Sequence, residues 1–208
     1  TTGAVIDSEP VPAQPPLKAP ATVNACRPGD VRPFAVSYYQ DKLYVGMVCS
    51  AESAPDADTD TVDGDGNGWL NWGDVRELRL YVYSVDPATL TFSDQPVFDA
   101  PLNNPRAGAY GGGAMLWNPW SDDWDRAWNP VAGSRTYPQP ILSDILFENG
   151  NLILGVRDRF GDQGGLNLPF GSSGEIQEAV MIGATLRACG DPQNGWTLED
   201  NARCNGQG

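Results

Sequence analysis

The amino-acid sequence predicts an all-β fold of four-stranded units like β-propeller blades, compatible with an incomplete propeller, with a β-sandwich as the alternative. Three observations lead to this prediction. Short runs rich in β-branched and aromatic residues alternate with turn residues. Two of these runs are hairpin signals that resemble each other. Seven prolines between residues 9 and 33 exclude a helix there and indicate an extended connection.

The first hairpin is expected over residues 34–49, where two β-prone runs meet at the turn residues Gln40-Asp41. Residues 77–85 alternate apolar and polar side chains, as a half-buried strand does. Asp86-Pro87 then turns the chain into a further strand expected over residues 90–97.

A second hairpin of the same kind is expected over residues 141–156, with Asn149-Gly150 as its turn. It aligns with the first hairpin if one residue is inserted at the turn. The matched segments are Leu43–Gly46 with Leu152–Gly155, and Tyr39 with Phe147.

A further self-match relates residues 89–97 to residues 3–11, so a unit of four strands is expected to occur at least twice. Four antiparallel strands are the arrangement of a propeller blade. The chain then begins in the last strand of one blade and ends partway through another, near residues 179–186. Because it is too short to close a ring, it is expected to be part of a longer polypeptide or to complete its sheet with a partner.

The expected organisation is a single β domain, or a segment of a larger propeller, over residues 1–208. Residues 9–33 are the proline-rich connection, and residues 56–74 are an acidic loop. A long insertion rich in glycine, tryptophan and proline covers residues 103–138.

Composition excludes several classes of function. The chain has no histidine, which excludes Ser-His-Asp catalysis and imidazole zinc sites. Its net charge of -14 opposes nucleic acid and anionic lipid, and favours hard cations. No window approaches 18 consecutive apolar residues, so no membrane span is predicted.

The four cysteines have no C-x-x-C spacing, and their even number favours two disulfides and an extracytoplasmic compartment. Three connectivities are open. The simplest pairs Cys26 with Cys49 and Cys189 with Cys204, because each pair brackets one local segment.

A resemblance to a known class of proteins rests on three segments, which are Tyr38–Gly46, Leu142–Phe147 and Leu154–Gln163. They resemble the propeller-like repeat region of large bacterial secreted and cell-surface proteins. The resemblance covers roughly residues 33–165 and implies a cell-surface location and this architecture, without implying a reaction.

The most specific motif is an acidic, glycine-rich loop over residues 63–74. A calcium loop of the EF-hand kind needs oxygen donors at positions 1, 3, 5, 7, 9 and 12 and glycine at position 6. The loop supplies Gly68 at position 6 and Leu70 as the apolar residue at position 8. The expected Ca²⁺ ligands are Asp63, Asp65, Asn67, the carbonyl of Trp69, Asn71 and Asp74.

Because it has aspartate at position 12, this loop resembles the calcium loops of dockerin modules. A dockerin has two such loops between helices, however, whereas this chain has one loop followed by a predicted strand, so cohesin binding is not expected. The carboxylates repel one another without the cation, so calcium is expected to order the loop and stabilise the fold. The upstream acidic residues Asp56, Asp58 and Asp60 are interpreted as a solvated loop, with a second ion as the alternative.

A tryptophan cluster lies within the long insertion. Its rings could stack on sugar faces, with nearby aspartates binding hydroxyl groups, but packing of the insertion against the sheet is the simpler interpretation. The cluster comprises Trp117, Trp120, Trp124 and Trp128, with Asp122, Asp123 and Asp125 between them.

A carboxylate pair for glycoside hydrolysis would need two of Asp144, Asp158 and Asp162 on one cleft. The alternating charges of Arg157–Asp162 are more simply an ion-pair network at a strand end. The chain is therefore expected not to be an enzyme.

Together these features predict an extracellular, calcium-binding structural or adhesion module of a bacterial surface or secreted protein. The same features are also compatible with a subunit of an extracellular fibre that takes a missing strand from a neighbouring chain. The expected partners are calcium and neighbouring copies or other domains of the same protein. The alternative is a carbohydrate-binding or carbohydrate-active domain with glycans as partners.

Overall fold

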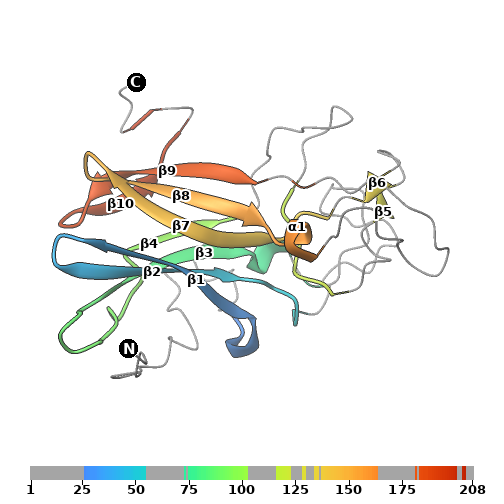
Figure 1. Cartoon of the computed structure of the whole chain (residues 1–208), viewed down its shortest axis with the longest axis horizontal. Helices are drawn as coiled ribbons and strands as arrows, with labels where there is room; N and C mark the ends of the chain where they lie inside the picture. The colour runs from blue at the N-terminus through green and yellow to red at the C-terminus, as the bar shows by residue number, and fades with distance from the viewer. Residues whose placement is uncertain are drawn as a thin grey trace, which may run out of the picture.

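The structure is a computed structural model that describes residues 26–54, 73, 75–102, 116–122, 128–129, 134–135, 137–163, 181, 183–200 and 203–204. Within these residues the fold is all-β, as predicted, with one four-residue α-helix and two short 3-10 helices (Figure 1). The 3-10 helices are η1 (Pro28–Asp30) and η2 (Val75–Glu77), and the α-helix is α1 (Phe160–Gln163). The strands are β1 (Val31–Tyr39), β2 (Lys42–Cys49), β3 (Arg79–Val85), β4 (Phe98–Pro101), β5 (Trp128–Asn129), β6 (Ser134–Arg135), β7 (Pro140–Glu148), β8 (Asn151–Asp158), β9 (Ala184–Asp191) and β10 (Gly195–Leu198).

Two four-stranded antiparallel sheets make up the body of the molecule. The N-terminal sheet has the order β1-β2-β3-β4, and the C-terminal sheet has the order β10-β9-β8-β7. Each is a meander of neighbouring strands, and β5 and β6 form a separate two-stranded ribbon. A further strand, β10, follows the segment near residues 179–186 where the chain was expected to end partway through a unit, and it is the fourth strand of the second sheet.

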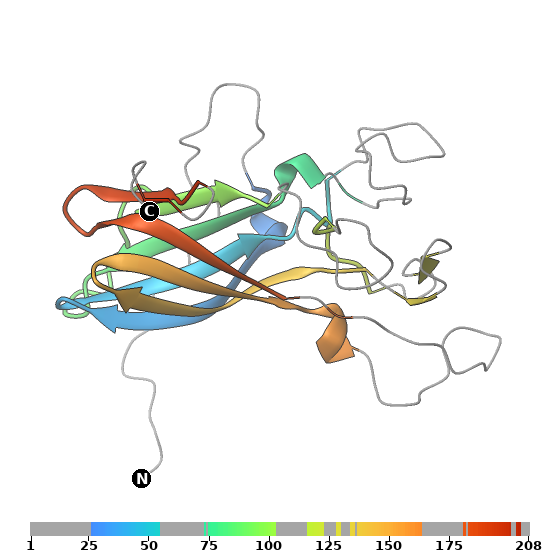
Figure 2. The same cartoon turned by 90° about the horizontal axis from the view of Figure 1, so that it is seen from above.

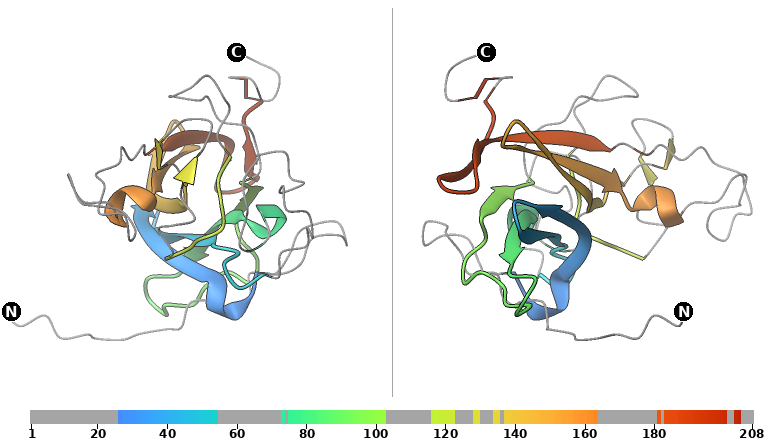
Figure 3. Two further views of the ribbon diagram at one scale, coloured as in Figure 1. Left: turned by 90° about the vertical axis from the view of Figure 1, so that its right-hand side faces the viewer. Right: turned by 60° about the vertical axis from the view of Figure 1, so that its left-hand side comes forward.

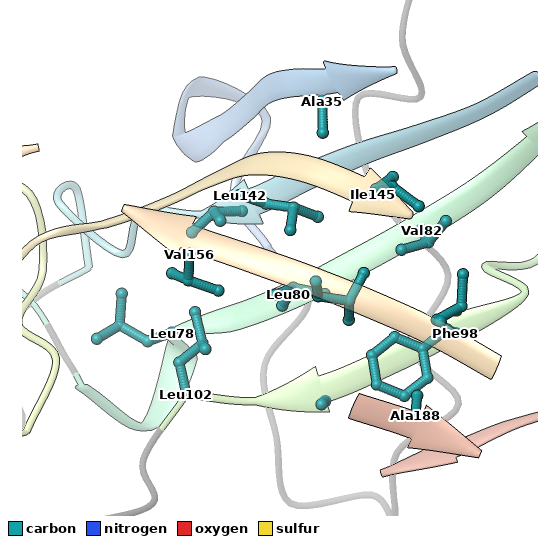
Figure 4. Packing of buried hydrophobic residues seen from close by; sticks show 14 of the residues in the cluster. Ala35, Leu78, Leu80, Val82, Phe98, Leu102, Leu142, Ile145, Val156 and Ala188 are labelled. Carbon is teal, nitrogen blue, oxygen red and sulfur yellow. The ribbon is translucent and has the colours of Figure 1, made fainter. Parts of the chain in front are cut away.

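The two sheets pack face to face around one core (Figures 2 and 3). Strands β1 and β2 lie against β7, and β4 lies near β10. Figure 4 shows side chains of both sheets in this core, with Leu80 near its middle and Phe98 of the N-terminal sheet beside Ala188 of the C-terminal sheet. The described residues do not close a ring of blades, and this packing corresponds to the sandwich alternative.

The strand prediction needs two corrections. Residues 90–97 contribute only an isolated bridge between Phe92 and Val85, and β4 starts at Phe98. Pro96 has no N–H for a ladder, and Leu90 has a positive φ of 55°, which explains why a regular strand does not form there. Of the last predicted strand, over residues 179–186, only residues 184–186 belong to β9, which begins at Ala184 and continues to Asp191.

The two hairpins are equivalent residue by residue with a constant difference of 109 in residue number. Both have two-residue turns with positive φ, Gln40-Asp41 and Asn149-Gly150, which is the geometry that matches the twist of the flanking strands. Both have a bulge six residues before the first residue of the turn, at Phe34 and at Ser143. The expected insertion at the turn is therefore wrong, and the structural equivalent of Phe147 is Tyr38.

The equivalent hairpins nevertheless turn opposite faces toward the core. Gly46 faces the C-terminal sheet, whereas its equivalent Gly155 faces away from the N-terminal sheet. Likewise Ile145 is buried in the core, while its equivalent Val36 is exposed. The two sheets are therefore related head to tail: one face of the hairpin is buried in the N-terminal sheet and the opposite face is buried in the C-terminal sheet. A two-fold axis would instead bury the same face of each.

Candidate functional site

Three long connections leave and return at the same end of the sandwich, opposite the two hairpin turns. They join β2 to β3, β4 to β7, and β8 to β9. Antiparallel pairing places the strand ends at this side, because Cys49 pairs with Arg79, and Pro140 pairs with Asp158. We call it the loop end, and define it by residues 50–54, 73–78, 116–122, 137–139 and 159–163. It lies at the right of Figure 1 with α1, β5 and β6, and the left panel of Figure 3 looks onto it.

The three connections that start from the loop end contain the three motifs that the sequence singled out. The predicted calcium loop lies in the first connection, the tryptophan cluster in the second, and the charged segment Arg157–Asp162 at the start of the third. In antiparallel sandwiches, loops gathered at one end commonly carry binding functions.

The predicted calcium ligands lie outside the described residues, as do Asp56, Asp58 and Asp60. Gly73 is the described residue of the loop. It is buried with a φ of +100°, and a Cβ built on it would overlap the carbonyl oxygen of Ala51 and lie 2.8 Å from Pro119 Cβ. Only glycine fits this position, so the C-terminal end of the loop is fixed against the framework.

The N-terminal side of the same connection is held by Asp30. Its carbonyl accepts a hydrogen bond from the amide of Ser50 at 2.8 Å, and its carboxylate accepts one from the amide of Ser53 at 3.2 Å. The disulfide between Cys26 and Cys49 lies directly beside these contacts. Among the described residues, no group of three or more acidic or cysteine side chains is placed to hold a metal ion.

Trp117 and Trp120 are packing residues. Their side chains are only 1% and 7% exposed, and the indole N–H of Trp120 donates to the carbonyl of Pro140 at 2.9 Å. The guanidinium groups of Arg159 and Arg32 lie 4.5 Å and 5.4 Å from the Trp120 ring centroid, within range of a cation–π interaction. Neither ring is open for stacking on a sugar. Trp124 lies outside the described residues, and Trp128 is described only as part of strand β5.

Arg159, at the start of the third connection, contacts residues of the second connection. Its guanidinium donates to the side-chain oxygen of Gln139 at 2.6 Å and to the carbonyl of Ser121 at 3.3 Å, and it pairs with Asp122. The Gln139 side chain also exchanges two hydrogen bonds with the backbone of Ser121. Sequence analysis missed Gln139 and Asp30, because no local pattern marks a polar residue that becomes buried through long-range contacts.

The candidate carboxylates have separate structural partners. Asp158 is buried, and one of its oxygens accepts hydrogen bonds from the amides of Gln139 and Phe160, each at 2.9 Å. Asp162 pairs with Arg157, and the Asp144 carboxylate accepts from the amide of Ile145 at 2.9 Å. The Arg157–Asp162 pair agrees with the ion-pair interpretation, whereas Asp144 and Asp158 accept hydrogen bonds from backbone amides.

The outer face of the N-terminal sheet carries two buried tyrosines, Tyr81 and Tyr83. They pack with Met47 and with the disulfide between Cys26 and Cys49. Burial raises the pKa of Tyr81 to about 12, and it also raises the pKa of Tyr83, because the ionised phenolate would lose its hydration. Both rings therefore remain neutral at physiological pH.

The structure contains two disulfides, Cys26–Cys49 and Cys189–Cys204, the two pairs that the spacing favours. Such bonds persist in oxidising compartments. In the described part of the chain, no helix is long and apolar enough to cross a membrane.

Comparison with known proteins gives two distant relatives, both from Dictyostelium discoideum. Colossin-A is 28% identical over 133 residues, which are 64% of this chain and 1% of Colossin-A. Colossin-B is 24% identical over 205 residues, which are 94% of this chain and 4% of Colossin-B. No family model matches, and no solved structure is significantly similar. The chain is thus similar to short stretches of two very long proteins.

Proposed function

We propose that the chain is a non-enzymatic, extracellular structural module whose loop end is stabilised by calcium. The observation that carries this proposal is the anchoring of the predicted calcium loop: Gly73 fixes one side, and Asp30 with the Cys26–Cys49 disulfide fixes the other. Anchoring at both ends reduces the conformational entropy that the connection loses when it orders around an ion, which favours binding.

The chemistry of the loop supports calcium as the ion. Its side chains offer hard oxygen donors, which calcium prefers, and the chain has no histidine and no free cysteine for softer metals. With calcium at a hundredfold excess over Kd, the fold would gain about 2.7 kcal/mol. Extracellular calcium is sufficient for a module of this kind.

The non-enzymatic part of the proposal rests on the carboxylates. Asp144, Asp158 and Asp162 each have a structural hydrogen bond or ion pair. The carbohydrate-binding alternative now depends on Trp124 and Trp128, because Trp117 and Trp120 are buried. The large negative charge opposes nucleic-acid partners.

We also propose that each sheet corresponds to one blade-like unit of a longer array at the cell surface. The four-stranded meanders, the constant offset between hairpins and the great length of both relatives support this part of the proposal. The relatives come from Dictyostelium discoideum, so the likeness to bacterial surface proteins stays a prediction.

The test is a thermal melt of the disulfide-intact protein with chelator and with calcium, for the wild type and for Asp65→Ala. We expect calcium to raise the Tm of the wild type by several degrees and to leave that of Asp65→Ala unchanged. Asp94→Ala, which removes an exposed carboxylate elsewhere, is the matched control and should respond like the wild type. Calorimetric titration should find one calcium ion per chain. No binding and no shift in Tm would refute the calcium proposal.

A further inference from the structure

The interface between the two sheets has a socket at Gly46. A Cβ built on Gly46 would lie 2.9 Å from Cδ1 of Ile145 and still closer to Cδ2 of Leu142. The missing side chain therefore makes the space that these two β7 side chains occupy. Close by, the rings of Tyr39 and Phe147 stack with 4.1 Å between their centroids.

Both halves of this interface recur on the outside of the molecule. The constant offset of 109 makes Gly155 the equivalent of Gly46, and makes Val36 and Tyr38 the equivalents of Ile145 and Phe147. Because equivalent hairpins turn opposite faces to the core, the second socket and the second pair of apolar side chains both point away from it.

The outer socket lies at Gly155. A shallow hollow of about 360 Å³ opens there on the outer face of the C-terminal sheet. A Cβ at Gly155 would meet nothing closer than Asp144 Cβ at 3.4 Å, so the space above the glycine is open, unlike that at Gly46. The hollow is lined by Ser143, Gly155, Val156, Arg157, Gly183, Ala184 and Thr185.

The outer counterpart lies on edge strand β1. Val36 is 65% exposed and Tyr38 is 61% exposed, which is unusual for neighbouring large apolar side chains on one strand face. The rest of this outer face is covered within the chain, since Met47, Tyr81 and Tyr83 are buried. Another molecule can therefore contact this outer face only on the side of β1. Strand β1 also makes the main contact between the two sheets within the chain, through β7.

We propose that copies of this chain stack head to tail, with Val36 and Tyr38 of one copy packing over the Gly155 hollow of the next. The occupant is a second copy because its exposed β1 face is equivalent to the face that already fills the Gly46 socket within the chain. Such a contact is heterologous, so it leaves one free surface at each end and builds a filament or a ring. The inference goes beyond the structural role proposed above and requires neither calcium nor sugar.

Charge sets the conditions for association. Each copy carries a formal net charge of -14, so long-range repulsion opposes stacking at low ionic strength. Salt screens this repulsion, while the packing of apolar side chains is insensitive to it. We therefore expect association to strengthen between about 0.02 M and about 0.5 M sodium chloride.

The experiment is sedimentation velocity on the disulfide-intact protein, at increasing protein concentration and at both sodium chloride concentrations. The wild type should form a concentration-dependent series of oligomers or a closed ring. Gly155→Asp and Val36→Asp/Tyr38→Asp should each weaken association by at least about tenfold. Gln95→Glu/Gln193→Glu adds two exposed charges elsewhere and should associate like the wild type.

Mixing the variants distinguishes head-to-tail stacking from any symmetric dimer. Gly155→Asp retains the β1 face, and Val36→Asp/Tyr38→Asp retains the hollow, so an equimolar mixture should form a one-to-one complex and nothing larger. If Gly155→Asp is unfolded by circular dichroism, Thr185→Asp takes its place in the mixture. A wild type that is monomeric throughout, or a mixture of folded variants without complex, would overturn the proposal. A chelator-treated sample separates this result from the calcium test.

Discussion

The ring of Tyr39 stacks on the ring of Phe147, with 4.1 Å between centroids and 5° between planes. These residues come from the first strands of the two sheets, close to the hairpin turns. Tyr44 and Trp196 also contact Phe147, with centroid distances of 4.7 Å and 6.0 Å. This aromatic group joins the sheets at the end opposite the loop end.

Removing the Phe147 ring should therefore destabilise the sandwich. We expect Phe147→Ala to lower the free energy of unfolding by about 3 kcal/mol, through lost burial and a residual cavity. Leu146→Ala is the control, because Leu146 is next to it in β7 but points outward and is exposed. It should cost less than about 1 kcal/mol. Urea denaturation followed by tryptophan fluorescence measures both, and equal losses would contradict the role of the stacked pair.

The two equivalent glycines give a matched pair of substitutions. Gly46→Ala forces its new Cβ against Leu142 and Ile145, and should cost about 1–3 kcal/mol. Gly155→Ala places its Cβ at ordinary contact distance from Asp144 and should change stability by less than about 0.5 kcal/mol. The denaturation midpoints of the two variants measure the difference. A similar cost at both positions would show that the two hairpins do not face opposite ways.

The loop end depends on Arg159 more than on Arg157. Arg159→Ala removes the contacts to Gln139 and Ser121 and the guanidinium over Trp120, so we expect a loss of about 2 kcal/mol. Arg157→Ala breaks an exposed ion pair with Asp162 and should cost less than about 1 kcal/mol. Thermal unfolding of the two variants tests the ranking, which a larger loss for Arg157→Ala would reverse.

Alkaline pH should destabilise the fold through Tyr81. Its pKa is about 12 in the folded state, against an ordinary value of 10.0. Below pH 10 the phenol is protonated in both states and has no effect on the pH dependence. Between about pH 10 and 12 the unfolded state loses the proton and the folded state keeps it, so the free energy of unfolding falls by about 3 kcal/mol.

Tyr81→Phe should make this alkaline decline shallower, since phenylalanine has no proton to lose, while Tyr83, whose pKa burial also raises, retains part of it. The chain has only two lysines, so few amines titrate in the same range. Denaturation midpoints at pH 8, 10 and 11 for the wild type and Tyr81→Phe are the measurement. Tyr38→Phe is the control, because Tyr38 is exposed and solvent screens the contact with Asp41 that raises its pKa. Identical slopes for the wild type and Tyr81→Phe would contradict the prediction.

Local sequence signals were sufficient for the elements that depend on neighbouring residues. The turns at Gln40-Asp41 and Asn149-Gly150 and the strands around them follow from residue types and short spacings. Of the three cysteine connectivities that the sequence left open, the structure has the simplest one. The strand expected over residues 90–97 is the instructive failure, because its composition favours β structure while Pro96 and the conformation of Leu90 interrupt the ladder. A mean preference over a window does not register such single backbone positions.

By itself the sequence determined that the chain is all-β, acidic and free of histidine chemistry, and it placed both hairpins and the candidate calcium loop. Only the tertiary structure decided which face of each hairpin is buried, because alternation along a strand separates two faces without saying which one meets the other sheet. The same packing buried Trp117 and Trp120, and strand pairing brought the ends of three distant connections to one side. Contacts between residues far apart in the chain set these features, and no local pattern encodes them.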